Sequence, residues 1–122
     1  MTASARAIEL ANILAQAAAE KLGENLVALD VTSVNPLADA VLIVSGRNER
    51  QVNAISDALE EKMLELGQKM IRREGKSLGR WVLLDFGDIW VHVMHEEHRM
   101  FYGLERLWND CPLIKLDVAE TA

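Results

Sequence analysis

The sequence has a single cysteine, Cys111, which excludes an internal disulfide and any zinc site built from cysteines. A lone thiol fits a reducing compartment. Long hydrophobic runs are also missing. The longest uncharged stretch near the start, residues 10–19, is too short to span a bilayer, and it lacks the basic start of a signal peptide. We therefore expect a cytoplasmic protein without a membrane partner.

Positive charge is scarce as well. Thirteen Lys and Arg residues oppose nineteen Asp and Glu residues, and the net charge is −6. Binding to nucleic acid through phosphates needs clustered positive charge, so we expect no direct nucleic-acid binding. The last third is the most acidic, because residues 81–122 carry three basic and eight acidic residues. Such a segment favours a basic protein surface as partner, although ordinary solubility explains the same charge.

The length of 122 residues predicts a single domain over residues 1–122. Caps and hydrophobic spacing predict helices from Ser4 to Gly23, from Asn48 to Gly67 and from Glu96 to Trp108. Strands are predicted over residues 26–31, 40–44, 69–74, 81–86 and 89–94. The fold class is therefore α/β, with one mixed β-sheet of about five strands and flanking helices. Residues 113–122 are expected to form a loose tail.

The first two helices are each predicted to bury one apolar stripe. In the first helix the stripe consists of Ile8, Ala11, Ala15, Ala18 and Leu22. In the second helix it consists of Val52, Ile55, Leu59, Met63 and Leu66. Asn48 is a good cap for the second helix, and Gln51, three residues later, gives a variant of the capping box.

The dipeptide Gly87-Asp88 between two apolar runs predicts a β-hairpin with a two-residue turn. This turn pairs residue 86 with 89, 84 with 91 and 82 with 93, so one face is wholly apolar and should belong to the core. The other face is mixed and holds three opposing pairs: Asp85 and Trp90, Leu83 and His92, Trp81 and Met94. It is either packed under a helix or used for recognition, because tryptophan is frequent at interface hot spots.

Two short motifs resemble metal or catalytic sites. His92, His95 and His98 recur every three residues, but positions three apart on a strand point to opposite faces. The spacing of His95 and His98 is also one residue short of the zincin motif. Asp85 and Asp88 form a carboxylate pair suited to Mg²⁺, although Asp88 is also an ordinary turn residue. A Mg²⁺-dependent, nucleotidyltransferase-like enzyme is therefore an alternative to a binding protein.

A series of motifs in a specific order covers residues 5–109. AVLIVSG at residues 40–46 leads into RQV at 50–52, and EG at 74–75 precedes WVLLDFGD at 81–88. VHVM at residues 91–94 is followed by RMFY at 99–102 and LERLW at 104–108. In order and spacing these segments resemble the ribosomal silencing factor family, also called the iojap or RsfS family. Family members often have Ser or Thr as the second helix cap, and Asn48 caps equally well.

The resemblance implies a non-enzymatic translation repressor without catalytic residues, cofactor or metal ion. It implies binding to the free large ribosomal subunit through ribosomal protein L-fourteen, which blocks joining of the small subunit when nutrients are scarce. It also implies a nucleotidyltransferase-like topology and a homodimer when the protein is free of the ribosome. Organellar relatives take part in ribosome assembly, so a large-subunit assembly factor is a further alternative.

The mixed hairpin face and the last helix are adjacent in sequence, and together they predict the docking patch for the ribosomal protein. The patch consists of Trp81, Asp85, Met94, Tyr102, Glu105 and Trp108. We expect Trp81 and Tyr102 to be anchors in pockets of the partner, while Asp85 and Glu105 pair with Lys or Arg.

Overall fold

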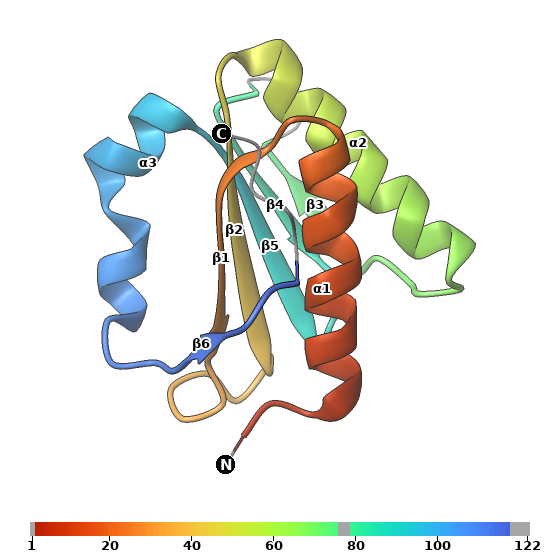
Figure 1. Ribbon diagram of the computed structural model, residues 1–122, viewed down its shortest axis with the longest axis vertical. Helices are drawn as coiled ribbons and strands as arrows, with labels where there is room; N and C mark the ends of the chain where they lie inside the picture. Colours follow the sequence, from red (N-terminus) through yellow and green to blue (C-terminus); the bar gives the residue numbers. More distant parts are fainter. Residues whose placement is uncertain (1, 76–78, 118–122) are drawn as a thin grey trace.

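The computed structural model describes residues 2–75 and 79–117, without the side chains of residues 100–102, 104 and 105. It confirms the predicted α/β class, since a mixed sheet lies between two long helices on one side and a shorter helical segment on the other (Figure 1). The helices are α1 (Ala5–Glu20), α2 (Glu49–Glu65), α3 (Glu96–Tyr102) and the 3₁₀ helix η1 (Leu104–Trp108). Among the described residues, no helix has the length and apolar character needed to cross a membrane.

The sheet has six strands in the order β3-β4-β5-β2-β1-β6, one more than the sequence predicted. The strands are β1 (Glu24–Asp30), β2 (Ala40–Gly46), β3 (Arg72–Glu74), β4 (Trp81–Asp85), β5 (Ile89–His95) and β6 (Leu113–Ile114). β2 and β5 are parallel, and the other neighbouring pairs are antiparallel. β2 is buried along its whole length, as its continuous apolar sequence predicts.

The sheet separates two apolar clusters. The larger cluster lies against α1 and α2 and includes the predicted apolar hairpin face: Val82, Leu84, Phe86, Ile89, Val91 and Val93. The smaller cluster lies on the opposite face, where Val41, Ile43 and Met94 are fully buried. Trp108 and Cys111 pack on it from the C-terminal segment. The mixed hairpin face is therefore partly covered.

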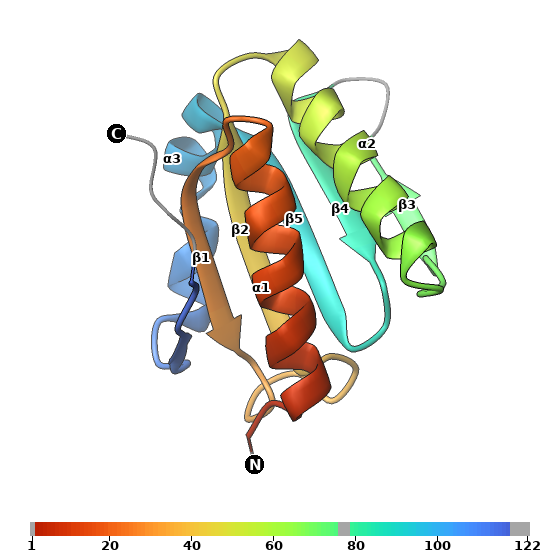
Figure 2. The ribbon, with the colours of Figure 1, turned by 45° about the vertical axis from the view of Figure 1, so that its right-hand side comes forward.

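The two long helices lie side by side on one face of the sheet (Figure 2). Both predicted caps are confirmed: Ser4 Oγ accepts from the N–H of Ala7 at 3.1 Å, and Asn48 Oδ1 accepts from the N–H of Gln51 at 2.8 Å. The side chain of Gln51 accepts from the N–H of Arg47 at 2.7 Å. This reciprocal bond thus reaches the residue before the cap, whereas a standard capping box uses the cap residue itself.

The predicted stripe of α1 is only partly correct. Its alanines are fully buried, but Ile8 is exposed and Leu22 is exposed beyond the helix end, with φ +64°. Leu10 and Leu14 occupy the core in their place, because an alanine-rich helix offers more than one apolar face. In α2 the stripe is confirmed at Val52, Ile55, Leu59 and Met63, while the C-cap residue Leu66 is exposed.

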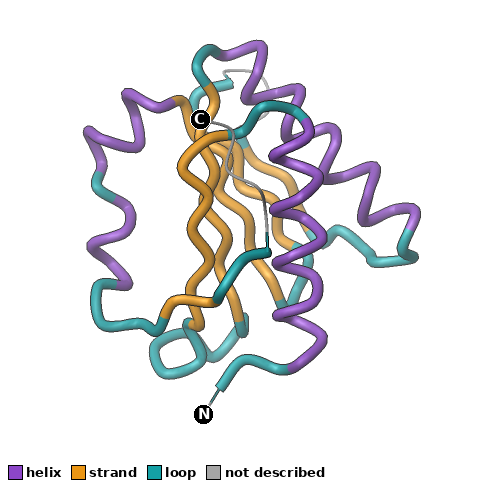
Figure 3. The backbone as a smooth tube through the Cα atoms, viewed as in Figure 1, coloured by secondary structure: helices purple, strands orange, loops and turns teal. Residues whose placement is uncertain are grey.

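The C-terminal segment differs from the predicted single helix and loose tail (Figure 3). Gly103 adopts the left-handed conformation, with φ +57°, so α3 ends there and the tighter η1 follows. β6 then pairs with β1, and the N–H of Asp117 donates to Asn12 Oδ1 at 2.8 Å. The prediction of a loose tail is thus wrong over residues 113–117, and residues 118–122 lie outside the described residues.

Candidate functional site

On the side away from α1 and α2, strands β3, β4 and β5 carry a surface that we call the aromatic face. It consists of Arg72, Glu74, Trp81, Leu83, Asp85, Trp90 and His92. The strand register brings these residues together, because one row pairs Arg72 with Asp85 and Trp90, and the next pairs Glu74 with Leu83 and His92. The side chains of Trp81, Leu83 and Trp90 are half-buried, so part of this apolar surface contacts solvent.

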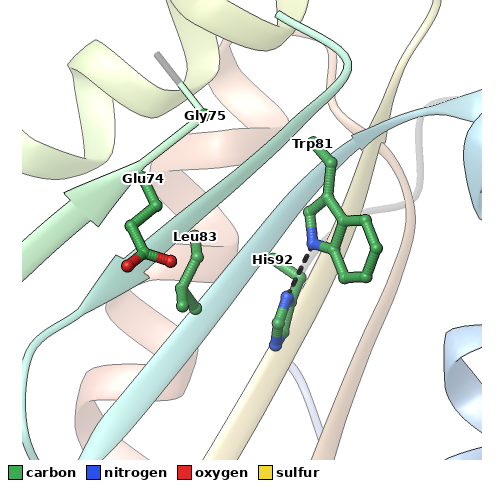
Figure 4. Close-up of a pocket in the computed structure, with 5 residues that line it drawn as sticks. All are labelled: Glu74, Gly75, Trp81, Leu83 and His92. Carbon is green, nitrogen blue, oxygen red and sulfur yellow. Dashed lines mark hydrogen bonds between the residues drawn. The ribbon is translucent and has the colours of Figure 1, made fainter.

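A pocket of about 270 Å³ opens on the aromatic face and is lined by Glu74, Gly75, Trp81, Leu83 and His92 (Figure 4). Glu74 and Trp81 stand at opposite ends, with Leu83 and His92 between them. Gly75 has φ +84°, and a Cβ atom there would lie 2.0 Å from the carbonyl oxygen of Trp81. Glycine therefore allows the chain leaving β3 to pass close to the start of β4 at the edge of the pocket.

His92 holds Trp81 in place. The Nε1–H of Trp81 donates to Nδ1 of His92 at 2.9 Å, so the neutral imidazole carries its proton on Nε2. The His92 ring contacts two indoles, with its centroid 5.9 Å from that of Trp81 and 5.7 Å from that of Trp108. His92 is 7% exposed, and burial lowers its pKa from 6.5 to about 4. It is therefore a neutral, fixed acceptor at pH 7.

Arg72 links the charged groups of the aromatic face. Its guanidinium lies 5.7 Å from the ring centroid of Trp90, and its Nε atom is 3.4 Å from Oδ2 of Asp85. Its NH1 atom is 3.3 Å from Oε1 of Glu74. The buried carboxylate of Asp85 also accepts from the N–H of Gly87 at 2.9 Å. Asp85 is thus already paired with Arg72 of β3 and with the hairpin turn. The aromatic face carries one cation, Arg72, and two anions, Glu74 and Asp85.

The structure describes the side chains of four of the six predicted docking residues. Trp81 and Trp108 both pack on the smaller core cluster and both contact the ring of His92, and Trp81 also borders the pocket. Met94 is fully buried beneath the surface. The expectation that Met94 contacts the partner directly is therefore wrong. The structure does not describe the side chains of Tyr102 and Glu105, so their predicted roles fall outside it.

The residues that suggested metal or Mg²⁺ chemistry have other roles. Nδ1 of His92 accepts from Trp81, and Nδ1 of His95 accepts from the N–H of Glu97 at 3.2 Å as the cap of α3. Asp85 is buried and paired, while Asp88 is exposed in the hairpin turn. Within residues 2–75 and 79–117, no group of three or more His, Cys, Asp or Glu side chains is placed to hold a metal ion.

Arg99 attaches the C-terminal segment to the sheet. Its buried guanidinium donates through NH1 to the carbonyl oxygen of Asn25 and to Ser45 Oγ, the latter at 2.9 Å. Asn25 presents its carbonyl from a left-handed conformation, with φ +53°, beside an irregularity in the β1–β2 pairing. Arg99 therefore fixes α3 against β1 and β2, and with it the segment that carries Trp108.

We expect Arg99→Ala to lower the free energy of unfolding by about 2 kcal/mol, because it removes charge-assisted hydrogen bonds in a buried position. Urea unfolding at pH 7 measures the effect. Arg106→Ala, at an exposed position of η1, is the matched control and should change the stability by less than about 0.5 kcal/mol. Equal losses in the two variants would show that Arg99 does not anchor the segment.

Comparison with known proteins places the sequence in a single protein family. The profile of the family described as "Ribosomal silencing factor during starvation" matches residues 4–122. The ribosomal silencing factor RsfS of Halalkalibacterium halodurans is 40% identical over 109 residues, 89% of this chain and 93% of the relative. RsfS of Bacillus subtilis is 41% identical over 105 residues, which cover 86% of this chain and 89% of that relative. A crystal structure of a Bacillus halodurans protein, 39% identical, matches with a TM-score of 0.79 over 88% of this chain and 98% of that one.

Proposed function

Because the chain belongs to the ribosomal silencing factor family, we propose that its aromatic face binds the large ribosomal subunit in the cytoplasm and thereby prevents joining of the small subunit. The contact on the subunit is ribosomal protein L-fourteen. We also propose that the protein is a homodimer when it is free of the ribosome. Sedimentation of the purified protein without ribosomes tests this part of the proposal.

The observation that carries the proposal is the fixed, half-buried indole of Trp81 beside a pocket. An aromatic anchor contributes most when it is already oriented, because binding then costs less side-chain entropy. His92 provides that orientation through its hydrogen bond at 2.9 Å and its ring contact. The Trp81–His92 pair thus has the properties of a preorganised hot spot.

Charge supports a protein partner. The net charge of −6 attracts the basic surface of a ribosomal protein and repels bare RNA. Complementary charge across the interface speeds association and makes it sensitive to salt. Silencing then needs no chemical step, because a protein bound at the subunit interface occupies the space that the small subunit requires. The fraction of silenced subunits follows the concentration of the protein by mass action.

Sucrose-gradient sedimentation of purified subunits, with and without the protein, tests the proposal. We expect the protein to comigrate with the large subunit, and the peak of joined ribosomes to fall as its concentration rises. Higher salt should move the protein towards the top of the gradient. If the protein stays at the top at low salt while the subunits join normally, the proposed function is wrong.

A further inference from the structure

Resting on the proposed function, we propose that the pocket on the aromatic face receives a lysine or arginine side chain of the partner protein. The charged end would lie at Glu74, and the aliphatic part would lie along Leu83 and Trp81. This assigns a specific chemical feature of the partner to the pocket, beyond binding through the aromatic face as a whole.

The charge of the pocket favours a cation. Of the pocket-lining residues that the structure describes, Glu74 and His92 carry titratable side chains, and His92 is neutral at pH 7 because burial lowers its pKa to about 4. Within this described lining, the carboxylate of Glu74 is therefore the ionised group. Arg72 touches it at 3.3 Å but also lies 3.4 Å from Asp85, so one guanidinium serves two carboxylates. A second cation would complete the neutralisation.

The shape of the pocket fits a long side chain with an apolar stem. Leu83 and the indole of Trp81 supply apolar walls, and Glu74 stands at the opposite end from Trp81 (Figure 4). Lysine and arginine bury their methylene groups on apolar surface while the charged end remains at a polar site.

Other occupants fit less well. A phosphate group or an acidic side chain would meet the carboxylate of Glu74 as a like charge. A wholly apolar side chain would take water from that carboxylate without replacing its hydrogen bonds, which is unfavourable. Because the Glu74 side chain is 61% exposed in the free protein, an incoming cation reaches it at little desolvation cost.

The test compares two glutamates that are replaced in the same way. Glu74→Gln removes the pocket charge, and Glu61→Gln removes an exposed charge from α2 on the other side of the sheet. We expect Glu74→Gln to weaken binding to purified large subunits about fivefold and to flatten its salt dependence. Charge reversal by Glu74→Lys should weaken binding more than Glu74→Gln does. Glu61→Gln should bind like the unmodified protein.

A charge-swap experiment identifies the partner residue. Among Lys→Glu and Arg→Glu variants of ribosomal protein L-fourteen, we expect one to bind Glu74→Lys better than it binds the unmodified protein. If the unmodified protein does not bind the subunit, the proposed function fails and this inference falls with it. If it binds, but Glu74→Gln and Glu61→Gln both bind equally well, the pocket does not receive a cation and only this inference is overturned.

Discussion

Lowering the pH from 7 to 5 should reduce the free energy of unfolding by about 2 kcal/mol through His92. The cause is the difference between its pKa of about 4 in the folded protein and its ordinary value of 6.5. Burial disfavours the imidazolium, and its Nδ1 atom must stay unprotonated to accept the hydrogen bond from Trp81. Protonation therefore costs more in the folded state than in the unfolded chain.

The direction follows from proton binding. Between pH 6.5 and 4 the unfolded chain binds more protons at this residue than the folded protein does, so acid favours unfolding. The contribution of His92 is fully present above pH 6.5 and is lost as the pH falls towards 4, in total about 3 kcal/mol. Asp30 also has a lowered pKa: burial raises it, but hydrogen bonds from Thr32 and Ala3 outweigh that effect. Its contribution is lost below its ordinary value of 3.8, outside this window.

Urea unfolding at several pH values between 7 and 5 measures the effect. His92→Asn should reduce the loss of unfolding free energy between pH 7 and pH 5 by about 2 kcal/mol. The Asn side chain can accept the hydrogen bond from Trp81 but does not titrate. His95→Asn is the matched control, since Asn is a good helix cap and the variant retains His92. An unchanged slope in His92→Asn would mean that another group causes the acid sensitivity.

The hairpin is the part of the fold that local sequence determines most completely. A two-residue turn fixes the register of both strands, and the observed pairs, including Leu83 with His92 and Asp85 with Trp90, are the predicted ones. The helix caps are predictable for the same reason, because each depends on residues within one turn. The residues on the mixed face of the hairpin, where the candidate site lies, are therefore predictable from local sequence alone.

The features that the sequence did not reveal depend on distant contacts. β6 exists because residues 113 and 114 pair with β1, and its two-residue length leaves no pattern to detect. Glu74 lines the pocket because β3 pairs with β4. The short polar sequence of β3 does not predict which strand it pairs with. Arg99 likewise depends on a distant contact, because it donates to Ser45, 54 positions earlier in the sequence. Local propensity says little about such contacts, since tertiary packing decides them.

Trp81→Ala should weaken binding to the large subunit by about 2 kcal/mol or more, roughly thirtyfold. The substitution removes the pocket wall and the hydrogen bond to His92, and with them the anchor that needs no reorientation on binding. Trp81→Phe keeps an aromatic ring but lacks the N–H donor, so the acceptor on His92 loses its partner. We expect its affinity to lie between those of Trp81→Ala and the unmodified protein.

Cosedimentation with purified subunits over a range of protein concentrations gives the affinities, and urea unfolding shows that each variant is folded. Trp90→Ala is the matched control, because Trp90 is half-buried on the same face but lies under the guanidinium of Arg72. Its truncation should weaken binding less than that of Trp81. If folded Trp81→Ala binds as tightly as the unmodified protein, the pocket is not the docking site, and the contact must lie on the C-terminal segment or another surface.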